Sequence, residues 1–283
     1  IYAGGAHTRT AMLENGLSAV WEAGDELAVW ARNSAGAFAL QNQIFKTYGL
    51  DERRGFFTSV LSEPMPEDTY TYFCSYPAPI SVNGTAATFG IPSVQNGKAS
   101  GGADVMIASP VQHSALTAIP DPEDHSGMSM IMNRMMHQFR FWVPAEDQVL
   151  GDEKIEKIYM TFPTAVTGNV TFDVPAQVTG GQADVQLNLN QPIGRTSGED
   201  YEYACFAFVP TQFAEGQSFT VKAYTDDKIA YFDPIDLKAR NFQAGHSTPV
   251  MLMPREIVDF AGIIYIKVGA NNLGENPRKI TLT

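Results

Sequence analysis

The stretch AVWEAGDELAVWA, residues 19–31, holds two apolar segments separated by Gly24 and Asp25. Glycine and aspartate favour turns, whereas Val and Trp favour strands. Along a strand, Asp25 and Glu26 would point to opposite faces, a geometry that does not suit shared acid–base chemistry. We therefore interpret the stretch as a turn followed by a strand, with Trp21 and Trp30 as large core or interface residues.

The composition of the whole chain is that of a folded, sheet-rich protein. Its 283 residues are 44% apolar and only 18% charged, which indicates one large domain or two of ordinary size. The 24 glycines and 17 prolines interrupt the chain at short intervals. The net charge of −12 argues against nucleic-acid binding, because that function needs a basic surface. It also argues against docking on an anionic membrane.

Apolar segments recur about every 10 to 18 residues along the chain, with Gly, Pro, Asn or Asp between them. This spacing predicts an all-β protein with little helix. The segment AIPDPEDHSG, residues 118–127, holds two prolines and three acidic residues and has the composition of an exposed connection. We therefore predict two tandem β-sandwich domains, residues 1–125 and residues 126–283.

Alternation defines the strands of the second half. The segment HQFRFWV, residues 137–143, places Phe139, Phe141 and Val143 on one face. The segments GNVTFDVP, residues 168–175, and ADVQLNLN, residues 183–190, resemble a hairpin that turns at the glycine pair 180–181.

Residues that could carry chemistry are few. The five histidines show no metal-ligand spacing, and no nucleophile elbow or phosphate-binding loop is present. His113 and His125 flank an acidic loop that could hold a divalent ion, but the loop lacks the ligand spacing of a calcium site and is interpreted as a solvated linker. We predict no catalytic residues, no metal site and no cofactor, and hence a protein that is not an enzyme.

The sulfur-containing residues lie in apolar surroundings. Cys74 and Cys205 each sit in an aromatic run, so they are either two separate buried thiols or one long-range disulfide. Five methionines lie between Met128 and Met136. They are interpreted as core residues at the domain junction, with an adaptable binding surface or a copper-thioether site as alternatives.

Seven segments, taken in order, resemble the fimbrillin family of type V pili, the Mfa-like and fimbrillin-A-like surface lipoproteins of Bacteroides-type bacteria. Each is weakly specific alone, and together they span nearly the whole chain. They are AHTRTAM (6–12), VWEAGDELAVWA (20–31), YTYFCSYP (70–77), FGIPSVQNGKASGGADVMIA (89–108), MMHQFRFWV (135–143), FVPTQFAEGQSFTV (208–221) and NFQAGHSTPVMLM (241–253).

The resemblance implies two Greek-key, transthyretin-like sandwiches with a structural and adhesive role at the cell surface, in a fimbrium on the outer membrane. The implied partners are other pilus subunits, identical or paralogous, and a host or bacterial surface ligand. Membrane attachment would come only through a lipid anchor on a precursor segment that is absent from this chain. No cofactor is implied.

The resemblance also implies assembly by strand exchange. An arginine-specific protease removes an N-terminal strand in the family's stalk subunits, and a neighbouring subunit then supplies a replacement strand. Arg9 matches the family's early arginine and is the candidate cleavage site, unless it is a plain loop residue. The candidate donor or edge strand, which could equally be the domain's own last strand, comprises Ile263, Ile264, Tyr265, Ile266, Lys267 and Val268.

A rival interpretation is a surface lipoprotein that does not polymerise and binds glycan or protein ligands. Exposed aromatic residues would form its binding platform, and Trp30, Tyr72 and Tyr76 are the candidates.

Overall fold

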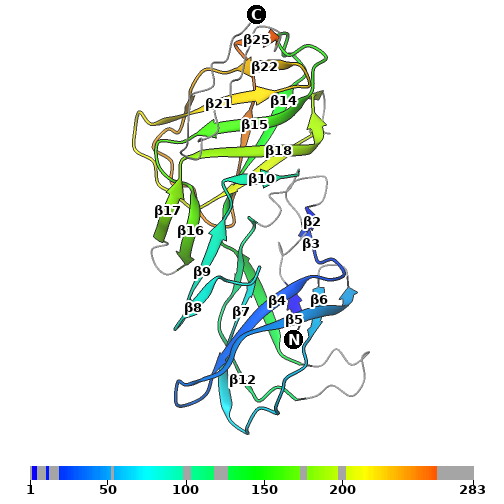
Figure 1. The fold of residues 1–283 in the computed structure, drawn as a ribbon, viewed down its shortest axis with the longest axis vertical. Helices are drawn as coiled ribbons and strands as arrows, with labels where there is room; N and C mark the ends of the chain where they lie inside the picture. Colours follow the sequence, from blue (N-terminus) through cyan, green and yellow to red (C-terminus); the bar gives the residue numbers. More distant parts are fainter. Residues whose placement is uncertain are drawn as a thin grey trace, which may run out of the picture.

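The computed structural model describes residues 2–4, 11–12, 19–51, 54–97, 103–117, 127–172, 177–196 and 202–259. Every regular element in these ranges is a β-strand, so the prediction of an all-β protein is confirmed. The strands form two lobes (Figure 1), with β4 (Glu26–Arg32) and β5 (Phe38–Asp51) in the lower lobe and β22 (Lys228–Tyr231) and β25 (Glu256–Asp259) at the top of the upper one.

The lower lobe is built on one large sheet that closes on itself. Strand β11 pairs with both β13 and β7, so a closed ring runs from β7 through β4, β5, β6, β1 and β13 back to β11. The strands of this sheet are β1 (Tyr2–Gly4), β4 (Glu26–Arg32), β5 (Phe38–Asp51), β6 (Arg54–Thr58), β7 (Thr69–Tyr76), β11 (Met106–Ala108), β12 (Val111–Ser114) and β13 (Ser129–Arg134). A small separate pair joins β2 (Ala11–Met12) to β3 (Ala19–Val20).

The turn predicted at the start of this lobe is confirmed. The backbone N–H of Asp25 donates to the carbonyl oxygen of Glu22 at 3.2 Å, and Gly24 has a φ of 94°, which favours glycine. Strand β4 follows at once and is buried on both faces. Leu27, Val29 and Ala31 belong to the lower lobe's core, whereas Trp30 packs on the other side. Burial on both faces explains the continuous apolar run in the sequence.

The upper lobe is a sandwich of two sheets. One sheet contains β10 (Val94–Asn96), β15 (Ile155–Thr161), β18 (Asp184–Ile193), β21 (Ser218–Tyr224), β22 (Lys228–Tyr231), β23 (Ile235–Asp236) and β25 (Glu256–Asp259). The facing sheet contains β14 (His137–Pro144), β19 (Arg195–Thr196), β20 (Ala204–Phe208) and β24 (Ser247–Met251).

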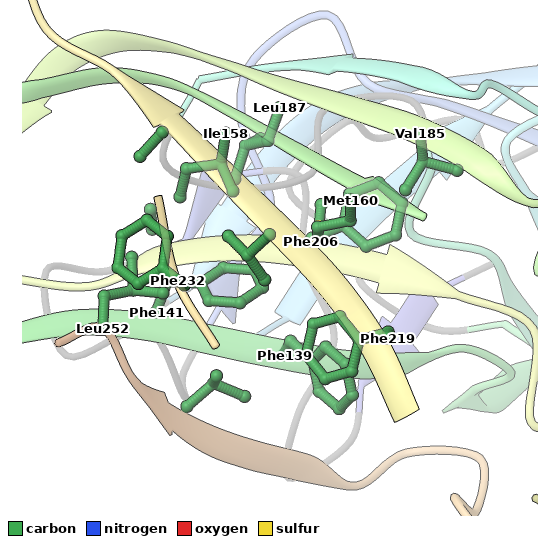
Figure 2. Close-up of a cluster of buried hydrophobic side chains, with 14 of the residues drawn as sticks. Phe139, Phe141, Ile158, Met160, Val185, Leu187, Phe206, Phe219, Phe232 and Leu252 are labelled. Carbon is green, nitrogen blue, oxygen red and sulfur yellow. The ribbon is translucent and has the colours of Figure 1, made fainter. Parts of the chain in front are cut away.

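Aromatic side chains fill the space between these two sheets. As predicted, Phe139, Phe141 and Val143 of β14 face this core together. Figure 2 shows Phe139 and Phe219 lying against each other, with a ring separation of 5.3 Å, although they come from opposite sheets. Each is at most 1% exposed, so this cluster is the main stabilising core of the lobe.

A third layer joins the two lobes. It contains β8 (Ser81–Asn83), β9 (Ala86–Ile91), β16 (Thr167–Phe172) and β17 (Gln177–Gln182), and β9 of the first half pairs with β16 of the second. Strand β10 then adds to the upper sheet beside β18, and β13 returns to the lower sheet. The division at residues 125 and 126 stays a prediction, but strands pair across it in both directions.

The predicted hairpin around the glycine pair 180–181 is wrong. Strand β16 pairs with β17, and Gly180 and Gly181 lie inside β17 rather than in a turn. Strand β18 follows after one residue and joins a different sheet, beside β15. Glycine is needed here because the backbones of β16 and β17 pass very close to each other. A Cβ added to Gly168 of β16 would lie only 2.8 Å from the Cα of Gly181.

Candidate functional site

Both sites predicted from the sequence, Arg9 and the segment 263–268, lie outside the described residues. Strand β1 is described and ends five residues before Arg9. Because β1 lies on the N-terminal side of Arg9, cleavage at Arg9 would separate this strand from the rest of the chain.

Strand β1 fills a gap between two other strands. Tyr2 and Ala3 pair antiparallel with Phe56 and Gly55 of β6. On its other edge, β1 pairs in parallel with Ser129, Met130 and Ile131 of β13. No other strand bridges β6 and β13 within the described sheet, so β1 is the element that closes the ring. Only three residues make this closure, which limits the number of hydrogen bonds that hold it.

Removal of β1 would expose two strand edges and part of the lower core. Met128, Met130 and Met132 are each at most 4% exposed and pack in the core of the lower lobe. These three residues are therefore core, as predicted, but they lie in the lower lobe's own core, whereas Met136 packs in the cluster between the lobes. Methionine side chains adapt their shape to different neighbours, and an opened ring would offer both hydrogen-bonding edges and this apolar surface to a replacement strand.

The aromatic platform of the rival interpretation does not exist as predicted. Trp30 and Tyr72 are 1% and 0% exposed, because both lie on strands that are covered on each side. Trp30 stacks on Phe73 with a ring separation of 5.6 Å, and the Tyr72 hydroxyl donates to the carbonyl oxygen of Ser114. Tyr76 is half-buried and packs edge-on against Trp21. Neither fully buried ring can reach a ligand.

A different set of tyrosines faces outward. Tyr159 on β15 is 38% exposed and lies 5.1 Å, ring to ring, from Tyr224 on β21. The sequence contained the signal for this surface: Tyr159 alternates with the core residues Ile158 and Met160. This outward face was not among the predictions made from the sequence.

The thiols are structural. Cys74 and Cys205 are both free and buried, so the disulfide alternative is wrong. Burial raises the pKa of both thiols, that of Cys205 to about 12. Both cysteines therefore stay protonated at neutral pH and are poor nucleophiles and metal ligands.

No metal site is evident in the part of the chain that the structure describes. No three His, Cys, Asp or Glu side chains come close enough there to hold an ion. The acidic loop between His113 and His125 is mostly outside the described ranges. The same ranges contain no helix long and apolar enough to cross a membrane.

Together, these features describe an all-β protein in which β1 closes the lower ring and tyrosines lie on the outer surface of the upper lobe. No family profile matches the chain, and no curated protein matches it in sequence. Several solved structures match it in fold.

One such structure is a "putative cell adhesion protein" from Bacteroides uniformis, with a TM-score of 0.56 and 17% identity over 91% of this chain and 93% of that one. A second, of the same description from Bacteroides fragilis, has a TM-score of 0.51 and 13% identity over 90% and 93% of the two chains. A third, from Bacteroides ovatus, has a TM-score of 0.50 and 15% identity over 91% and 96%. At these identities the comparisons establish a shared fold.

Proposed function

We propose that this chain is a structural and adhesive subunit of a fimbrium, exposed at the outer membrane and assembled by exchange of β-strands between subunits. The shared fold with solved proteins described as cell adhesion proteins supports the adhesive class. The resemblance of seven segments to fimbrillins supports the fimbrial role. The observation that carries strand exchange is the position of β1 between β6 and β13.

The proposed assembly starts with cleavage after Arg9. The released peptide, residues 1–9, would contain all of β1. Its loss leaves unpaired N–H and C=O groups on β6 and β13, and a strand from another subunit restores these hydrogen bonds. The proposed donor is the segment 263–268, whose apolar face of Ile264, Ile266 and Val268 suits the methionine-lined interior.

The test is cleavage of the chain by an arginine-specific protease, followed by mass spectrometry and light scattering. We expect loss of residues 1–9 and growth of particles well above the monomer mass. Arg9→Ala should block both events, whereas Arg240→Ala, which removes an exposed arginine from the upper lobe, should block neither. Polymer that forms equally from Arg9→Ala would contradict the proposal.

A second pair of variants tests the donor segment. Ile266→Asp places a charge on the face that would enter the acceptor, and we expect normal cleavage without polymer. Tyr265→Asp places the same charge on the opposite face and should leave assembly intact. Equal assembly by both variants would exclude this segment as the donor.

A further inference from the structure

The outer face of the upper sheet carries a regular array of aromatic, amide and amine side chains. Alternation along β15, β18 and β21 sends one set of side chains to the core and the other set outward. Strand pairing aligns the outward set into rows, because Tyr159 lies opposite both Gln186 and Lys222, and Lys222 lies opposite Tyr231. We call this surface the tyrosine face, comprising Lys157, Tyr159, Gln186, Lys222, Tyr224 and Tyr231.

The aromatic rings of the tyrosine face are held in place by their neighbours. Tyr159 and Tyr224 meet edge to face at an interplanar angle of 62°. Nζ of Lys157 lies 5.9 Å from the ring centre of Tyr159, and Nζ of Lys222 lies 5.7 Å from that of Tyr231. Such contacts order both the rings and the amines before any ligand arrives, which reduces the entropy lost on binding.

An amide row borders the rings. Nδ2 of Asn188 donates to Oδ1 of Asn96 at 2.8 Å, and Nε2 of Gln186 donates to Oδ1 of Asn188. A shallow depression of about 340 Å³ lies on the same face, and its lining includes Tyr159, Gln186 and Lys222. It is open to solvent and combines aromatic surface with hydrogen-bonding groups that point outward.

The two charged residues that define the tyrosine face are amines, and Glu256, which lies opposite Tyr231 at the edge of this face, is paired with Arg255. Lys157 and Lys222 make no ion pair with any described residue, whereas nearby Lys228 pairs with Glu153. The one acidic group that lines the depression, Asp184, accepts a hydrogen bond from Thr161 at 2.6 Å at the edge away from Lys157. Two unneutralised amines on a chain of net charge −12 favour an anionic ligand at this place.

We propose that the tyrosine face binds an acidic polysaccharide whose sugars carry carboxylate groups. The C–H faces of the sugar rings would pack on the tyrosine rings, whose faces are electron-rich. The carboxylates would pair with Lys157 and Lys222, and the hydroxyl groups would bond to the amide row. A flat, open surface suits a long chain that crosses several strands. This inference rests on the adhesive part of the function proposed above and does not require strand exchange.

The test uses the uncleaved chain and polygalacturonate as the probe, with neutral dextran as the matched polymer. We expect calorimetric binding of polygalacturonate that weakens as salt is raised, because the amines contribute through screened charge. Tyr159→Ala and Lys222→Glu should each weaken binding at least tenfold. Lys154→Glu, the same charge change in the turn before β15, should weaken it less than twofold.

Three binding results would overturn the inference: equal binding of dextran, equal loss in Lys154→Glu, or no detectable binding by the folded wild-type chain. Circular dichroism and the thermal midpoint establish that each variant is folded. If Tyr159→Ala instead lowers the oligomeric mass of the uncleaved protein, the face is a contact between copies and the inference fails. The protease assay on the same variants reports on strand exchange separately, so failure of one proposal does not imply failure of the other.

Discussion

At the scale of single residues, Gln95 links the two halves of the chain. Its side chain is fully buried, and its amide forms two hydrogen bonds with one backbone unit of β20. Nε2 donates to the carbonyl oxygen of Ala207 at 2.6 Å, and Oε1 accepts from the Ala207 N–H at 3.0 Å. A buried glutamine is stable only when both ends of its amide are satisfied, as they are here.

Replacing Gln95 should therefore be costly. Gln95→Ala leaves the N–H and the carbonyl of Ala207 without these partners, and each buried orphan group costs about 1–3 kcal/mol. Urea denaturation should show a loss of unfolding free energy in that range or above it. Gln112→Ala, an exposed glutamine on β12, is the control and should change stability by less than about 0.5 kcal/mol. Equal effects in the two variants would refute the linking role.

His137 makes stability depend on pH. Nδ1 lies 2.9 Å from the carbonyl oxygen of Gln243, so it carries the proton, and Nε2 lies 3.0 Å from Oγ1 of Thr248. Burial lowers the pKa of this imidazole below its usual 6.5, and the backbone hydrogen bond to Gln243 offsets only part of the shift.

The sign follows from proton binding. The unfolded chain binds a proton at His137 more readily than the folded chain does. The contribution of the neutral, buried His137 to stability is therefore complete above about pH 6.5 and is lost as the pH falls. The unfolding free energy measured in urea should be lower at pH 5.5 than at pH 7.5. His137→Gln should reduce that difference, whereas His113→Gln, at a half-buried position on β12, should preserve it. An unchanged pH dependence in His137→Gln would show that other groups cause it.

At the scale of elements, the pairing of β16 with β17 depends on glycine. The register shifts between Thr167 and Asn169, and Gly168 at this irregularity has a φ of 126°. Across from it, a Cβ on Gly181 would overlap the Cβ of Ala165 and lie 2.9 Å from Cγ1 of Val178. The two backbones approach so closely that neither position has room for a side chain.

Gly181→Ala should destabilise the protein by about 1–3 kcal/mol, the usual cost of overpacking. The matched control is Gly194→Ala, because the nearest atom to a Cβ there would be Cγ of the flexible Lys154 side chain, at 3.4 Å. Thermal unfolding monitored by circular dichroism can compare the two. If both variants have the midpoint of the wild type, the close approach has no energetic consequence.

At the scale of the whole molecule, the two lobes share a core as well as a sheet. Trp30 and Phe73 from the lower lobe pack in one cluster with Phe89 of β9, Val170 of β16 and Val209, which follows β20. In Figure 1, β9 and β16 lie at mid-height between the lobes. This contact between the lobes buries more apolar surface than two domains joined only by a flexible linker would share.

We therefore expect the lobes to unfold together. Calorimetry should give one transition, with the calorimetric and van't Hoff enthalpies in agreement. Trp30→Ala should lower the midpoint of this single transition. The loss of a buried tryptophan from the shared cluster costs about 3–5 kcal/mol of unfolding free energy. Two separated transitions, only one of which moves in Trp30→Ala, would show that the lobes are independent.

Much of the strand content was predictable because side-chain alternation is a local property of extended backbone. The runs around Trp30, Phe139 and Ile158 show their strands and buried faces without any knowledge of their partners. The burial of both cysteines followed from their apolar neighbours in the same way. The aromatic residues of the predicted platform were misassigned because a large aromatic side chain suits a buried core as well as an exposed binding surface, and only the packing of distant strands shows which it occupies.

The sequence by itself determined that this protein is a series of short β-strands with an apolar interior, and its pattern resembles that of fimbrillins. Only the tertiary structure decided which strands pair: β9 with β16, β10 with β18, and β1 between β6 and β13. The physical reason is that strands pair through backbone groups, which are the same in every residue but proline. Partner choice therefore depends on how distant segments pack as a whole, and a local pattern does not encode it.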